Sequence, residues 1–187
     1  NFLTPLGKFV CTELSNKVAY DSLQIHGGVG YIKDFPIERL YRDARITNIY
    51  EGTTQLQVVA SIGAVTSGFF FELVRNTIDT QVNSLREEKS TIEKLIDEME
   101  KTAKKVKDYE SKEFLDFSAN YIIEMASIIY RLVLYLPVAD QNEEKRDLFY
   151  FFLNDSKDKI NYLNDKVGSL LENYGGDIVS LKNQFTN

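Results

Sequence analysis

The sequence predicts an all-α protein, on three observations. The 187-residue chain has only three prolines, at positions 5, 36 and 137, so long helices can run with few interruptions. Apolar side chains recur at the three- and four-residue spacing of helices. No segment shows the alternation of apolar and polar residues that is typical of strands. We therefore expect two helical bundles, and a change in composition divides them into residues 1–82 and residues 83–187.

The first half of the chain predicts helices that are separated by glycine corners. One helix should extend from about residue 5 to residue 25 and end at Gly27-Gly28 and Gly30. A short helix should begin near Pro36, because the fixed φ of proline suits a first helical turn. The residues of this short helix that we expect to point inward are Ile37, Leu40 and Tyr41.

A third helix should follow the corner Tyr50-Glu51-Gly52, with Thr53 or Thr54 as its amino-terminal cap. Its packed side is expected to carry small and apolar residues, which are Leu56, Val59, Ala60, Gly63, Ala64, Ser67 and Phe70. Small residues on this side predict close packing against another helix.

The second half of the chain predicts three long helices. The first is highly charged and carries one apolar stripe, formed by Leu85, Ile92, Leu95, Ile96, Met99, Ala103 and Val106. Two more helices are expected at about residues 112–136 and 143–174. Pro137 and the turn Asp140-Gln141-Asn142 should separate them, and Gly175-Gly176 should end the last one.

Composition excludes several classes of function. The 28 acidic and 22 basic residues give a net charge of −6, so nucleic acid is not an expected partner. The longest apolar runs are too short to span a bilayer, which takes roughly 20 residues. One cysteine, Cys11, and one histidine, His26, cannot by themselves form a zinc site, and we expect no metal. A single cysteine fits a reducing compartment, so we expect a cytoplasmic location.

The region from Gln24 to Gln57 is the densest in groups that can bind a ligand. It contains no G-x-S-x-G elbow and no P-loop, and Gly28-Val29-Gly30 lacks the third glycine of a dinucleotide fingerprint. A helix that begins just after Glu51-Gly52 points its positive end at that corner, which would stabilise a phosphate or a developing oxyanion. Glu51 could act there as a base or could simply cap the helix, and the residues alone leave both open.

Three motifs in this region, in order and in register, resemble the acyl-CoA dehydrogenase family. They are QIHGGVGY (24–31), PIERLYRDAR (36–45) and IYEGTTQLQ (49–57). The similarity covers roughly residues 5 to 65, and the remainder resembles only loosely the helical extensions of some members. The resemblance implies an FAD-dependent oxidoreductase of fatty acid metabolism that introduces an α,β double bond into an acyl-CoA thioester.

The resemblance also implies roles for individual residues in substrate chemistry. The family's catalytic base falls on Glu51, which would remove the α-proton while the β-hydrogen leaves as hydride to the flavin. A carboxylate pressed between flavin and thioester loses water and becomes a stronger base. Tyr50 would line the acyl pocket and Gly52 would contact the substrate. His26 occupies a variable place in the motif and is expected to form only a local hydrogen bond.

Cofactor roles follow from the same register. Thr53 and Gln55 fall on flavin contacts. Gln24, Gly27 and Gly28 fall on contacts to the adenosine-diphosphate end of the FAD held by a neighbouring subunit, where a Cβ would keep the backbone from the pyrophosphate. A homo-oligomer, a dimer or a tetramer, and an electron-transfer flavoprotein as acceptor are the implied partners.

Two positions depart from the family pattern. Val58 stands where many relatives have a basic residue, and Gly63 where many have an arginine; both fit a subgroup in which residues 83–187 replace part of the usual tetramer packing. The chain reads like part of a longer protein, and alone it should be inactive. A different interpretation is a helical oligomerisation or assembly module without catalytic activity of its own.

Overall fold

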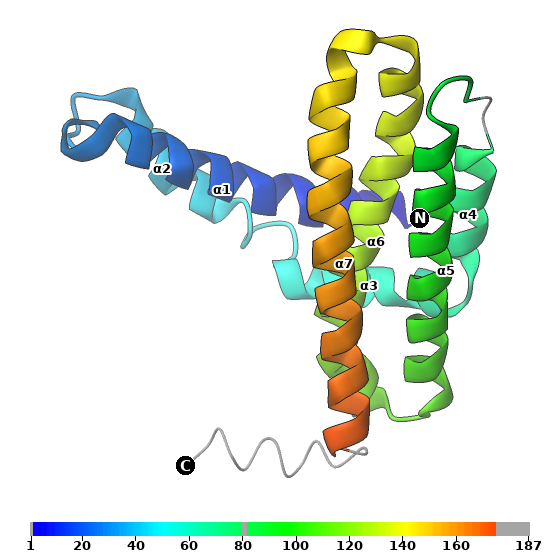
Figure 1. Cartoon of the computed structure of the whole chain (residues 1–187). Helices are drawn as coiled ribbons and strands as arrows, with labels where there is room; N and C mark the ends of the chain where they lie inside the picture. The colour runs from blue at the N-terminus through cyan, green and yellow to red at the C-terminus, as the bar shows by residue number, and fades with distance from the viewer. Residues whose placement is uncertain (1, 80–81, 175–187) are drawn as a thin grey trace. The chain divides into compact units, whose positions relative to one another are not determined.

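The computed structural model describes residues 2–79 and 82–174, and all regular structure in these ranges is helical (Figure 1). The all-α prediction is therefore confirmed. Contacts divide the chain into two compact units, Asn1–Ser61 and Ile62–Asn187, and each is described by itself. Composition placed the boundary between two domains at residue 83, and that boundary stays a prediction.

The first unit contains α1 (Leu3–Gly30) and α2 (Pro36–Ile46), which pack against each other (Figure 1). α1 ends at Gly30, within the glycine corner where its end was predicted. Gly27 has φ 63° and ψ −157°, values that are essentially restricted to glycine, and the helix is kinked there and continues for three more residues.

α2 begins at Pro36, as predicted, and its first turn buries Ile37. Leu40 and Tyr41 were expected to point inward as well, but 55% and 39% of their surfaces are exposed. The reason is that α2 packs against α1 along one narrow stripe, so the wider apolar face that the sequence suggested stays uncovered within the described residues.

α3 (Thr54–Thr66) buries a different face from the predicted one. Leu56 and Val59 are 59% and 45% exposed. The buried residues are instead Val58, Ser61, Ile62 and Val65. Apolar and small residues occur all around this helix, so its periodicity does not single out one face. Gly68, with φ 91°, lies between α3 and the next helix, α4 (Phe69–Ile78). Phe70 therefore lies on α4 and not on α3, where it was expected.

The second unit is built from α4, α5 (Arg86–Asp108), α6 (Lys112–Gln141) and α7 (Arg146–Tyr174). α5, α6 and α7 run side by side, and α6 packs against all three other helices (Figure 1). The predicted stripe of α5 is confirmed, since all seven of its residues are at most 5% exposed. The predicted stop at Gly175-Gly176 lies outside the described residues.

The prediction that Pro137 breaks the helix is wrong, because Pro137 lies inside α6. Proline costs one backbone hydrogen bond and crowds the carbonyl four residues earlier. Burial of the neighbouring Leu136 and Ala139, both fully inaccessible, outweighs that cost. By length and composition α6 could also cross a bilayer, but 61% of its most apolar stretch is buried inside the bundle, as is common in a core helix.

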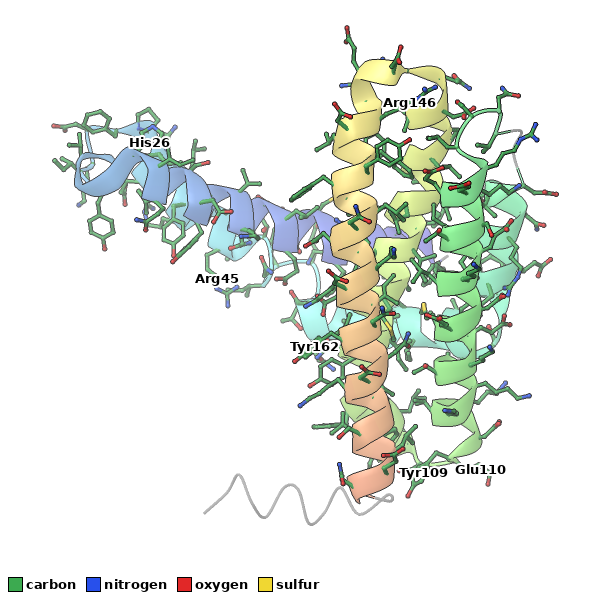
Figure 2. All side chains as sticks on the ribbon, viewed as in Figure 1. His26, Arg45, Tyr109, Glu110, Arg146 and Tyr162 are labelled. Atoms are coloured by element: carbon green, nitrogen blue, oxygen red, sulfur yellow. The ribbon has the colours of Figure 1, made fainter. Side chains whose placement is uncertain are left out.

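Asp140 ties the end of α6 to the start of α5. Its carboxylate accepts hydrogen bonds from the backbone N–H groups of Asn83 (2.9 Å), Ser84 (2.8 Å) and Leu85 (3.0 Å) and from the Ser84 hydroxyl (2.8 Å). Arg146, at the start of α7, donates to the Ser84 hydroxyl (2.9 Å) and to the Asp140 carbonyl (3.1 Å), and Figure 2 shows it at this end of the bundle. The backbone hydrogen bonds, that from Asn83 first, hold the pKa of Asp140 well below its usual range.

We predict that Asp140→Asn destabilises the bundle in a pH-dependent way. The folded-state pKa lies below the unfolded value of roughly 3.9, so the carboxylate contributes its full stability above about pH 4 and loses it as the pH falls further. At pH 7 the free energy of unfolding should drop by about 2 kcal/mol or more, measured by urea denaturation. The gap to the wild type should narrow below pH 4. Asp158→Asn, at an exposed position of α7, is the control; a gap that widens in acid contradicts the account.

Candidate active site

Glu51 lies in a strained corner between α2 and α3. Its φ is 53° and that of Gly52 is 90°, so both residues have left-handed backbone. Among the described residues Glu51 and Glu110 are the two non-glycine positions with positive φ. This conformation costs a residue with a Cβ roughly 1–2 kcal/mol. Contacts to other parts of the chain must therefore hold Glu51 in place.

Two side chains bind the three carbonyl groups of this corner. The Lys8 ammonium, on α1, donates to the carbonyl oxygens of Tyr50 and Gly52 and lies 5.4 Å from the centroid of the Tyr50 ring. The Gln57 amide, on α3, donates to the carbonyl oxygens of Glu51 (3.0 Å) and Gly52 (3.3 Å). A Cβ on Gly52 would lie 2.7 Å from Gln57 Nε2, so the Gln57 amide would have to shift if this position carried a side chain.

A second network fastens both ends of the corner to α1. Asn48 donates to the Glu13 carboxylate and accepts from the side chain of Asn16. The Thr54 hydroxyl donates to the same carboxylate at 3.0 Å, and the Thr54 N–H donates to the Asn48 carbonyl at 3.1 Å. The sequence did not predict these roles for Glu13, Asn16, Asn48 or Lys8, because their contacts between α1 and the corner span about thirty positions or more and follow no local pattern.

The residues next to the corner begin α3. The Thr53 hydroxyl accepts a hydrogen bond from the Leu56 N–H at 3.4 Å, so Thr53 caps the helix, one of the two caps predicted. Gln55 lies exposed in the first turn. The corner thus brings together Tyr50, Glu51, Gly52, Thr53 and Gln55, the predicted substrate, catalytic and flavin residues.

The glycine corner lies at the other end of α1. Gln24, Gly27 and Gly28 are exposed there, and open space surrounds the position of a Cβ on either glycine, so a ligand can reach bare backbone. Gly30 is different, because a Cβ on it would lie 2.4 Å from the Cβ of His26. His26, at this end of α1 in Figure 2, makes the expected local contact, with Nδ1 2.8 Å from the Ser22 carbonyl oxygen.

A cavity of about 530 Å³ lies along α1 and α2 within the first unit. Its lining includes Asn16, Leu23, Tyr31, Lys33, Glu38, Tyr41, Arg42 and Arg45. Tyr31 is 73% exposed. Arg42 forms an ion pair with Glu38 at 3.3 Å, at the four-residue spacing that places two side chains side by side on a helix. Within residues 2–79 and 82–174 no group of three or more His, Cys, Asp or Glu side chains is placed to hold a metal ion.

The segment that contains this corner is similar to a known protein family. Residues 2–64, which include the glycine corner, α2 and the whole Tyr50–Gln57 corner, match the family model of the acyl-CoA dehydrogenase C-terminal domain. Residues 2–64 are thus similar to the C-terminal domain of acyl-CoA dehydrogenases. The three motifs that carried the resemblance all lie within the matched segment.

Curated relatives match stretches of 52 to 58 residues of this chain. A caffeyl-CoA reductase–Etf complex subunit of Acetobacterium woodii is 47% identical over 58 residues, which are 31% of this chain and 15% of the relative. A 3-(aryl)acrylate reductase of Clostridium sporogenes is 53% identical over 58 residues, 30% and 15% of the two chains. An acyl-CoA dehydrogenase of Bacillus subtilis is 50% identical over 52 residues, 28% and 14%. The matched stretch of this chain therefore spans about a seventh of the length of these relatives.

A solved structure resembles both units of the chain. The acyl-CoA dehydrogenase of Bacillus anthracis, complexed with FAD, superimposes with a TM-score of 0.70 at 20% sequence identity. The superposition covers 96% of this chain and 35% of that one. At this level of identity the likeness concerns the fold alone.

We predict opposite effects of alanine at two glycines of α3 and its corner. Gly52→Ala should lower the free energy of unfolding by about 1–3 kcal/mol, because its φ is 90° and the new Cβ meets Gln57. Gly63→Ala should raise it by about 0.5–1 kcal/mol, because Gly63 is helical and open space surrounds its Cβ position. Urea denaturation measures both, and equal effects of the two substitutions would refute this description of the corner.

Proposed function

We propose that this chain is part of an FAD-dependent acyl-CoA dehydrogenase and that Glu51 is its proton-abstracting base. The observation that carries the proposal is the corner itself. A carboxylate residue is held there in left-handed backbone by side chains from two helices, within the motif that matches the family. Strained backbone of this kind is maintained at functional sites, where it forms part of the mechanism.

In the proposed reaction Glu51 takes the α-proton of the acyl-CoA thioester. The α C–H bond breaks, its electron pair forms the double bond between the α- and β-carbons, and the β-hydrogen leaves with its own electron pair. A bound flavin supplies the acceptor for that hydride. Glu51 must be ionised beforehand and protonated afterwards. Tyr50 would line the acyl pocket, and Gly52 would bring bare backbone against the thioester.

The residues proposed for FAD occupy two separate places. Thr53 and Gln55 would bind the flavin next to Glu51. Gln24, Gly27 and Gly28 would bind an adenosine-diphosphate end, and the exposed backbone of the two glycines fits that role. From Lys8, which binds the Glu51 corner, to Gln24 the helix advances roughly 24 Å at 1.5 Å per residue. Contact of these two places with two different FAD molecules, as the resemblance implies, would require a homo-oligomer.

The same site would serve reduction as well as oxidation. Two of the relatives named above are reductases, and an acryloyl-CoA reductase (NADH) of Anaerotignum propionicum is 54% identical over 52 residues. In that direction Glu51 would deliver its proton to the α-carbon, by microscopic reversibility. An electron-transfer flavoprotein is the proposed electron partner, since one relative is a subunit of an Etf complex.

We predict that Glu51→Gln abolishes proton transfer but not binding. The test uses the chain fused to the domains that precede the matched segment in its relatives, here called the fused enzyme. The rate at which an acyl-CoA bleaches the flavin should fall at least about 100-fold, with the substrate Kd nearly unchanged, by stopped-flow absorbance. Glu110→Gln is the matched control, because Glu110 has the same left-handed backbone but lies in the second unit. Wild-type bleaching by Glu51→Gln would rule out this assignment.

The assembly interpretation remains a second candidate for residues 83–187. It is favoured by apolar side chains that α7 exposes, since Phe151 is 73% and Tyr162 59% exposed. If these residues form an oligomer contact, the fused enzyme truncated after residue 82 should sediment as a smaller species. An oligomer of unchanged subunit number would rule the module out as the assembly element.

A further inference from the structure

We propose that Lys8 is a positioning residue for Glu51. Its ammonium group binds the carbonyl oxygens of the two residues that flank Glu51 and so fixes the backbone from which the base acts. This inference rests on the proposed function of Glu51 and deepens it.

Two backbone rotations set the conformation of Glu51. These rotations, φ and ψ, relate the peptide plane that contains the Tyr50 carbonyl to the plane that contains the Glu51 carbonyl. Lys8 holds the first of these planes and Gln57 holds the second. Both side chains also bind the Gly52 carbonyl, which fixes the next plane. Together they determine the left-handed conformation of Glu51.

The charge of Lys8 strengthens this role. Hydrogen bonds from a charged donor are roughly twice as strong as neutral ones. The same ammonium lies 5.4 Å from the centroid of the Tyr50 ring, within the range of a cation–π contact. Lys8 therefore couples the backbone of the proposed base to the aromatic side chain that would line the acyl pocket.

The other contacts of the corner do not replace Lys8. Asn48 and Thr54 fasten the two ends of the corner to Glu13, but their side chains do not bind the carbonyl groups of residues 50 to 52. Lys8 and Gln57 bind those groups. Loss of the Lys8 ammonium should therefore leave the corner attached to Glu13 on α1, while the backbone of Glu51 becomes free to change its conformation. The structural change should be confined to the corner.

The first experiment measures this conformation directly in the 187-residue chain. Amide hydrogen exchange of residues 50–54 should become about tenfold faster in Lys8→Met, and Lys8→Arg should restore part of the protection because it keeps a charged donor. Lys17→Met is the control, since Lys17 lies exposed on the same helix and pairs with Asp21. Unchanged exchange in Lys8→Met would overturn the proposal.

The second experiment measures the consequence in the fused enzyme. Lys8→Met should lower the rate constant of flavin bleaching by about 10- to 100-fold while the substrate Kd changes less than about twofold, because a misplaced base impairs the reaction more than binding. Lys8→Arg should recover part of the rate. A wild-type rate in Lys8→Met, with Glu51→Gln inactive, would overturn the positioning role. If Glu51→Gln proves active, the proposed function fails, and the exchange experiment still decides whether Lys8 fixes the corner.

Discussion

The left-handed backbone of Glu51 and Gly52 is the constraint on which the candidate site depends. It turns the chain between α2 and α3 and sets the direction in which the Glu51 side chain leaves the backbone. Gly52 adopts this conformation freely, whereas Glu51 adopts it at a cost. The hydrogen bonds of Lys8 and Gln57 offset that cost, so helices α1 and α3 are both needed to present one carboxylate.

The departures from the family pattern affect how α3 packs. Val58 is fully buried, and a cation at such a position would be costly without a partner. Gly63 faces open space. α3 buries a different face from the one that the apolar pattern suggested. Its buried residues include Val58, Ile62 and Val65, whereas Leu56 and Val59 are exposed. The likeness in fold to the Bacillus anthracis enzyme extends over the bundle of α5, α6 and α7, so such a bundle also occurs within an acyl-CoA dehydrogenase chain.

Sequence reasoning succeeded where one local pattern dominated. The stripe of α5 was predicted correctly, because charged residues surround it and leave a single apolar face. It failed at α3, where small and apolar residues occur on every side, and at Pro137, where tertiary packing outweighs a local preference. In the site, the motif around Glu51 identified the residues that follow one another in the chain. It could not identify Lys8 or Glu13, because their contacts depend on how α1 folds back on a corner about forty residues away.

Glu51 is held in a left-handed backbone conformation that only glycine adopts without cost. The most direct test compares the free energies of unfolding of Glu51→Gly and Glu51→Ala in the 187-residue chain by urea denaturation. At an ordinary helical or extended position alanine is the more stable of the two by roughly 0.5–1 kcal/mol. The account predicts the reverse, with Glu51→Gly more stable than Glu51→Ala by about 1 kcal/mol. A more stable alanine variant would contradict it.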